Sequence, residues 1–195
     1  MTRFCLTLSC CVLLLTGCAG SGGAPSMFLL DTSAPAVRAS HVAAPVLIID
    51  RVTVAPYLDD SGIVYQTEPH RVVMANNNRW ASPLATQLTD GLYSALDGSV
   101  NNAHIQRPGS NAPASALHLV TRVDQFMGHY DGYAHIAGQW QLVDASGTRL
   151  AGRHFEQRLP LQNDGYDALV ESLSRGWRMT AESLVPPLSE TLATQ

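Results

Sequence analysis

Hydrophobic and polar positions along the chain change their spacing several times, and each change predicts a different element. Apolar residues alternate with other residues over Val46–Val54, which is typical of a strand. Shorter apolar runs at Phe28–Asp31, Ile63–Gln66, His70–Met74 and Ala103–Gln106 indicate further strands. In the longest of these segments the alternation predicts a shared face made by Val46, Ile48, Val52 and Val54.

Two later stretches repeat every three to four residues, which predicts helices. The first begins near Ser82-Pro83, where a proline is tolerated because the first-turn N–H has no helical partner, and it ends at Asp97-Gly98. The second runs from about Asp164 to Val185, and Pro186-Pro187 are expected to end it. The expected buried faces are Trp80, Leu84, Leu88, Leu92 and Leu96 for the first helix and Leu169, Val170, Leu173, Trp177, Thr180, Ala181 and Leu184 for the second.

Three longer strands are predicted between the two helices, at Leu117–Met127, Tyr133–Val143 and Thr148–Leu159. The connections at Gly128–Gly132 and Asp144–Gly147 are rich in turn residues, so these strands should form an antiparallel meander. The order of the elements predicts an α+β fold: a mixed, largely antiparallel sheet with two main helices packed on one face.

The amino terminus has the parts of a bacterial secretory signal peptide: Arg3, an apolar stretch too short to span a membrane, and small residues at its end. Leu15-Thr16-Gly17-Cys18 fits the lipobox of bacterial lipoproteins. We therefore expect removal of residues 1–17 and attachment of diacylglycerol and an N-acyl chain, such as palmitate, to Cys18. Residues 18–26 would form a flexible tether, and residues 27–195 a single domain.

Charge and cysteine content narrow the possible partners. The chain carries 12 basic residues, none of them lysine, against 16 acidic residues, for a formal net charge of −4. An acidic chain with scattered arginines argues against nucleic acid as a partner. Of the four cysteines only Cys18 remains after cleavage, so no disulfide can form within one mature chain.

Side chains that could perform catalysis are present but lack an activating arrangement. Asp59-Asp60 stand next to each other in a polar turn, where carboxylates usually face water independently. His129 and His135 flank a predicted hairpin and could approach each other, but the pattern supplies no clear third metal ligand. We therefore expect no metal, no cofactor other than the lipid on Cys18, and no enzymatic activity.

Several short stretches carry the pattern of one known family. Ala55–Tyr65, leading to Arg79–Leu84, resembles the ABC-type transport auxiliary lipoproteins, the paraquat-inducible lipoprotein C group. Those proteins typically show a strand ending in Pro-x-Tyr-Leu, a short Ile-Val-Tyr strand, and Arg-Trp-Ala-x-Pro-Leu opening a helix. They also carry an aromatic-Leu-Leu near the mature start, which Phe28-Leu29-Leu30 matches. The resemblance covers roughly Met27–Leu184.

The resemblance implies a lipid-anchored periplasmic accessory subunit, a tether or docking adaptor, of a trans-envelope lipid transport system that contributes to membrane integrity. Its partners would be a protein with mammalian-cell-entry (MCE) domains and the associated ABC or permease components. Ala19 is not the aspartate that marks inner-membrane retention in enterobacteria, which favours the outer membrane, facing the periplasm. The candidate partner-binding residues are Tyr57, Leu58, Asp59, Tyr65 and Arg79.

Other possibilities stay open at this point. A long edge strand in the meander could support self-association into a homo-oligomer. A periplasmic carrier of lipid or a small molecule would need an apolar pocket of roughly several hundred Å³ between the helices and the sheet. An enzyme would use the histidine pair, which metal analysis would test, whereas an adaptor predicts a partner protein and neither co-purifying lipid nor a cavity.

Overall fold

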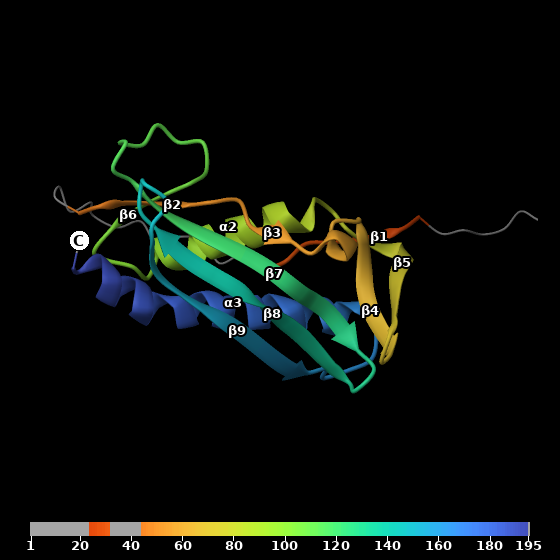
Figure 1. The fold of residues 1–195 in the computed structure, drawn as a ribbon. Coiled ribbons are helices and arrows are strands. Elements are labelled where there is room, and N and C mark those ends of the chain that lie inside the picture. Colours follow the sequence, from red (N-terminus) through yellow and green to blue (C-terminus); the bar gives the residue numbers. More distant parts are fainter. Residues whose placement is uncertain (1–23, 32–43, 195) are drawn as a thin grey trace, which may run out of the picture.

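The computed structural model describes residues 24–31 and 44–194. The predicted signal peptide, Cys18 and most of the tether lie outside these residues. In the described part of the chain, nine strands form one mixed sheet, and two long helices lie together behind it (Figure 1). This arrangement confirms the predicted α+β fold. No helix in these residues has the length and apolar character needed to cross a membrane.

The predicted meander forms one half of the sheet. Strand β7 (Leu117–His129) pairs antiparallel with β8 (Tyr133–Val143), and β8 pairs antiparallel with β9 (Arg149–Pro160). The bounds of β8 are those predicted, and the other two strands differ from their predictions by one or two residues at an end. Clean alternation of buried and half-buried positions along β8 explains why its bounds could be predicted so closely.

Helices α2 (Leu84–Asp97) and α3 (Tyr166–Leu192) bury the faces that the helical spacing predicts. All seven predicted residues of α3 are buried, as are the four leucines of α2. Trp80 is also buried, but it is the last residue of strand β5 (Arg71–Trp80) and not part of the helix. Its place in the helical repeat was therefore wrong, because Ser82-Pro83 separates the strand from the helix.

The two prolines near the end of α3 do not stop the helix, contrary to prediction. Pro186 and Pro187 lie inside it, although an interior proline removes a backbone hydrogen bond and costs roughly 3 kcal/mol. Beyond them, Leu188 and Leu192 are almost completely buried, and burial of a leucine contributes about 1.5–3 kcal/mol. Asn102 also donates to the carbonyl oxygen of Ser189 at 2.8 Å. Core packing beyond the two prolines thus favours continuation of the helix against the local preference for an end.

The edge of β7 opposite β8 pairs with three short strands, which follow one another along it. These strands are β2 (Val46–Ile49), β3 (Thr53–Val54) and β4 (Gly62–Glu68), and each pairs with β7 in parallel. Strand β7 is thus bonded along both edges and forms the centre of the sheet (Figure 1).

The strand predicted at Val46–Val54 is interrupted. Between β2 and β3 the backbone N–H of Val52 turns to α2, where it donates to the hydroxyl oxygen of Thr89 at 2.9 Å. The interruption shifts the alternation of side chains, so the predicted shared face was wrong. The residues of this segment in the main core are Leu47, Ile49 and Val52, whereas Val46 and Val54 are only half-buried.

The remaining strands complete the two ends of the sheet. Strand β6 (His104–Gln106) pairs with β2, and β1 (Ser26–Phe28) pairs with the end of β5, both in parallel. Strand β5 is twice as long as the predicted segment His70–Met74, because β4 and β1 supply hydrogen bonds to its polar second half. Strand β1 begins and ends earlier than predicted.

Aromatic rings fill the space between the helices and the sheet. The ring of Phe126 on β7 lies 6.1 Å from that of Trp80 and 6.4 Å from that of Trp177 on α3. Phe155 on β9 meets the other side of Trp177 at 6.1 Å. These four side chains are at most 8% exposed, so they join both helices to both halves of the sheet in one core.

Candidate functional site

The segment that follows the predicted tether is fixed firmly to the folded body. Strand β1 pairs with β5, and the carbonyl oxygen of Phe28 accepts a hydrogen bond from Ala81 N at 2.8 Å. The backbone N–H of Leu30 then donates to the side-chain oxygen of Gln87 on α2 at 2.7 Å, in a buried position. Both β5 and α2 therefore hold this segment against the folded body.

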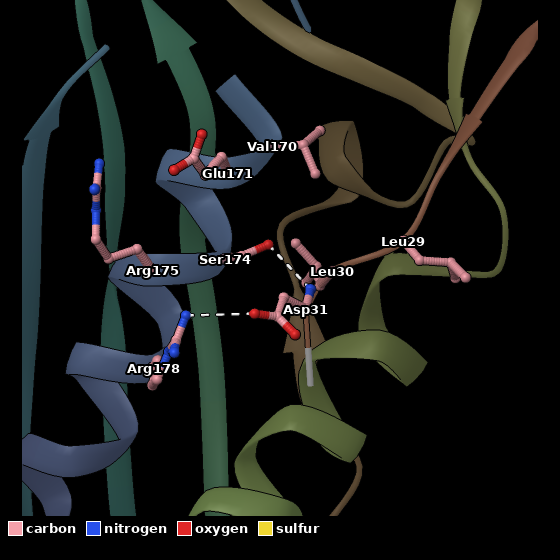
Figure 2. A pocket seen from close by; sticks show the side chains of 8 residues that line it. All are labelled: Leu29, Leu30, Asp31, Val170, Glu171, Ser174, Arg175 and Arg178. Carbon is pink, nitrogen blue, oxygen red and sulfur yellow. Dashed lines mark hydrogen bonds and ion pairs between the residues drawn. The ribbon is translucent and has the colours of Figure 1, made fainter. Parts of the chain in front are cut away.

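A groove lies beside this segment, between it and α3. The backbone N–H of Asp31 donates to the hydroxyl of Ser174 at 3.1 Å, and its carboxylate lies 3.6 Å from the guanidinium of Arg178 (Figure 2). The groove has a volume of about 540 Å³ and is open to solvent. It is lined by Leu29, Leu30, Asp31, Val170, Glu171, Ser174, Arg175 and Arg178. The groove combines the Asp31–Arg178 ion pair with the apolar side chains of Leu29, Leu30 and Val170. Such a surface is suited to binding another molecule, and its lining residues include no activated nucleophile.

Two of the predicted partner-binding residues lie in a short 3₁₀-helix, η1 (Pro56–Leu58). Tyr57 is half-buried, and its hydroxyl donates to the carbonyl oxygen of Asp124 on β7 at 2.6 Å. Burial and the nearby negative charge of Asp124 raise the pKa of this phenol. Leu58 is only 2% exposed and belongs to the core, so the prediction that it binds a partner was wrong. Its apolar neighbours in the sequence gave no sign of which of them points inward.

The other three predicted residues occupy two different places. Asp59 is exposed and borders a shallow groove of about 260 Å³ next to Trp80. Arg79 is exposed as well, opposite Gly62 in the β4–β5 pair, and its Nε donates to Asn76 O at 2.8 Å. Tyr65 lies farther along β4, and its hydroxyl donates to His129 O at 3.0 Å. The hydroxyls of both tyrosines thus bind backbone oxygens of β7 and fasten the outer segments to it.

An apolar surface that the sequence analysis missed lies on β5. Val72, Val73 and Met74 are 42%, 45% and 44% exposed. Because successive side chains of a strand point to opposite faces, three exposed residues in a row mean that both faces of β5 are uncovered here. Among the described strands, β1 covers only the last three residues of the outer edge of β5. The run Val-Val-Met was the available signal, but the sequence analysis interpreted it only as part of a short strand.

The histidine pair considered in the sequence analysis does come together, at the β7–β8 hairpin. The rings of His129 and His135 stack with centroids 4.4 Å apart. The carboxylate of Asp131 lies against both rings: Oδ1 is 2.9 Å from His129 Nδ1, and Oδ2 is 3.0 Å from His135 Nε2. The third polar group that the sequence spacing did not reveal is therefore in the turn itself.

Asp131 is the centre of this cluster and is held as a carboxylate. Partial burial alone would raise its pKa, but four hydrogen bonds together hold the pKa far below its usual range. The partners are the Arg158 guanidinium, the rings of His135 and His129, and the backbone N–H of Tyr133. Oδ1 thus contacts groups of the hairpin, and Oδ2 contacts the hairpin and β9.

Comparison with known proteins places these features in a family. Residues 28–185 match the family model described as "ABC-type transport auxiliary lipoprotein component". The chain is 37% identical over 143 residues to the intermembrane transport lipoprotein PqiC of Escherichia coli (strain K12), which covers 71% of this chain and 72% of that protein. The PqiC of Shigella flexneri matches with the same identity and coverage.

Solved structures share the fold. The crystal structure of an uncharacterized protein superposes with a TM-score of 0.73 at 30% identity, over 86% of this chain and all of that protein. A protein from Xanthomonas campestris superposes with a TM-score of 0.71 over 85% of this chain and 95% of its own. Its identity of 17% supports the fold alone.

Proposed function

Because the chain belongs to the ABC-type transport auxiliary lipoprotein family, we propose that it is a lipid-anchored periplasmic subunit of a trans-envelope lipid transport system. In this role it is a tether or docking adaptor and not an enzyme. Its partners are an MCE-domain protein and the associated ABC or permease components, and the assembly contributes to membrane integrity.

The attachment of β1 is the observation that carries the proposal. A tether is useful only if the segment next to the anchor stays bound to the folded domain when the domain pulls on the anchor. Here that segment is bound by three residue pairs between β1 and β5 and by the buried hydrogen bond from Leu30 N to the Gln87 side chain.

Lipid on Cys18 supplies the anchoring energy. Each buried CH₂ contributes about 0.8 kcal/mol, and a single chain binds a membrane only reversibly, so durable anchoring needs a second chain. Residues 19–25 would then hold the domain near partners in the same envelope and raise its effective concentration. With Ala19 after the cysteine, we place the anchor in the outer membrane, facing the periplasm.

The exposed run Val72–Met74 is the surface we assign to the partner protein. It is apolar on both faces of β5, and no strand of residues 24–31 or 44–194 pairs with its outer edge, so another strand can add there. Asp59 and Arg79 are the originally predicted residues that remain exposed, and we keep them as contributors at the other end of β4 and β5.

Site-specific photocrosslinking in intact cells tests the proposal. A photoreactive residue is placed at Val73, with Val120 as the matched control, because Val120 is a similarly exposed valine on β7. Capture of an MCE-domain protein from position 73 and not from position 120 supports the adaptor. Capture of none at either position, with lipid co-purifying instead, would favour the carrier.

The packing of the core argues against the carrier. Phe126, Trp177 and Phe155 occupy the region between α3 and the sheet, where a carrier needs its pocket. Opening that space would separate these aromatic rings. Removing one buried aromatic side chain typically lowers the free energy of unfolding by about 3–5 kcal/mol, so the separation would be costly.

A further inference from the structure

We propose that His129, Asp131 and His135 form a binding site for one divalent transition-metal ion, and that Zn²⁺ is the ion their chemistry favours. Two imidazole nitrogens and one carboxylate are a ligand set that zinc accepts, with a fourth position left for water. The two imidazoles favour zinc over Mg²⁺ or Ca²⁺, which prefer oxygen ligands.

The distances suit one small ion. One ligand atom from each of the three residues can be chosen so that all lie within 4.8 Å of one another. Tetrahedral zinc with bonds of about 2.0–2.1 Å holds its ligand atoms roughly 3.4 Å apart. The carboxylate of Asp131 lies 2.9 Å from His129 through Oδ1 and 3.0 Å from His135 through Oδ2, so an ion would enter by widening contacts that already exist. The two rings are stacked with their planes 29° apart, so one ring must rotate out of the stack before both nitrogens point to the ion.

One nitrogen in the cluster has two neighbours with opposite requirements. His129 Nδ1 lies 3.3 Å from the backbone N–H of Asp131, which needs an acceptor, and 2.9 Å from its carboxylate oxygen, which needs a donor. An imidazole nitrogen offers either a lone pair or a proton, but not both. A cation bound by the lone pair makes the carboxylate contact favourable, because the ion then lies between two electron-rich atoms.

The hairpin holds the three side chains in place without an ion. Tyr133 N donates to Asp131 Oδ1 at 3.1 Å, and the turn is closed by Gly132 with φ of +82°, a conformation suited to glycine. Tyr65 fixes the backbone of His129 from β4. The three side chains are 16%, 23% and 17% exposed, which shields the charges from water while leaving a path for an ion.

The guanidinium of Arg158 would compete with a metal ion for the carboxylate of Asp131. Its Nη2 lies 2.9 Å from Asp131 Oδ2, and its guanidinium lies over the Tyr133 ring at 3.7 Å. This positive charge opposes a second cation and shares an oxygen that the ion needs. Because the side chain is half exposed, it can move toward solvent when the ion binds. The native site is therefore weaker than its ligands alone would make it.

Calorimetric titration of the lipidated protein in detergent with ZnCl₂ tests the proposal. Wild type should bind one Zn²⁺ per chain, His135→Gln should weaken binding at least about 10-fold, and Arg158→Gln should tighten it. His154→Gln is the control, since His154 is exposed on β9 away from the hairpin.

The Arg158→Gln variant separates a metal site from a purely structural cluster. If the cluster only locks the hairpin, loss of Arg158 removes a bond to Asp131 and gives no gain in zinc affinity. Absence of zinc binding in both wild type and Arg158→Gln would overturn the proposal, as would unchanged affinity in His135→Gln. Co²⁺, whose visible absorption reports tetrahedral coordination, should give that spectrum in wild type and not in His135→Gln.

Discussion

Trp177 on α3 donates its indole N–H to the carbonyl oxygen of Leu88 on α2 at 3.0 Å, in a fully buried position. The same ring contacts Phe126 and Phe155 of the sheet. One side chain thus sets the spacing of the two helices and their distance from the strands below. We expect it to be the most sensitive single position in the core.

Replacement of Trp177 by phenylalanine should lower the free energy of unfolding by about 1–3 kcal/mol, through a lost hydrogen bond and a partly empty site. Urea denaturation followed by far-UV circular dichroism measures the change. Met179→Ala, on the exposed side of the same helix, should change stability by less than about 0.5 kcal/mol. Equal midpoints for wild type and Trp177→Phe would contradict this prediction.

Replacement of Gln87 by alanine should release the segment next to the tether. The backbone N–H of Leu30 would then be buried without an acceptor, at a cost of roughly 1–3 kcal/mol. Hydrogen exchange at residues 26–31 should become much faster while exchange in β8 stays slow. Thr86→Ala, one residue earlier on α2, serves as the control. If exchange at residues 26–31 stays as slow as in wild type, β1 alone fastens the segment.

Replacement of Val73 by aspartate should prevent capture of the MCE-domain partner and leave folding intact. The change places a charge in an apolar contact but affects a side chain that is already exposed. Val120→Asp is the matched control on β7. The measurements are co-purification from detergent-solubilised membranes and the growth of cells on detergent. Normal recovery of the partner with Val73→Asp would remove this surface from consideration.

The turn between β8 and β9 should make stability depend on acid pH. Hydrogen bonds from the Ser146 hydroxyl and from the Thr148 and Ser146 backbone lower the pKa of Asp144. A lowered pKa means that the stabilisation is present above the unfolded-state value of about 3.9 and is lost as pH falls through the lower folded-state value.

Asp144→Ala should therefore lower the melting temperature most at neutral pH, and the difference from wild type should shrink below about pH 4. Thermal unfolding at a series of pH values measures this difference, with Glu190→Ala on α3 as an exposed-carboxylate control. A difference that stays constant down to pH 2 would mean that the turn does not depend on the ionised carboxylate.

Much of the fold could be predicted from local spacing, and the failures have identifiable causes. The buried faces of both helices and the bounds of β8 follow from regular repeats that no distant contact disturbs. The break after β2 depends on Thr89, far away in sequence, and the passage of α3 through Pro186-Pro187 depends on burial of Leu188. No window of neighbouring residues carries that information.

The candidate site was predictable only in part, for a similar reason. The family was identified from short motifs, and the match over residues 28–185 confirms it. Which motif residues are exposed depends on the tertiary fold, so Leu58 was wrongly assigned to a surface. Asp131 stood between the two histidines in the sequence, but its orientation toward both rings is a property of the turn.

The position of β7 also determines the order in which the domain can assemble. Strands β2, β3 and β4 precede their parallel partner β7 by more than fifty residues in the chain. The pairing of β2 and β3 with β7 must therefore wait, whereas β7, β8 and β9, like β4 and β5, pair through short turns. Pulse-labelling hydrogen exchange during refolding should show protection in β7–β9 before β2 and β3. The end of the sheet that contains β2 and β3 is then among the last parts to become structured, so a chain in which β7 has not yet paired exposes strand edges that can bind other chains.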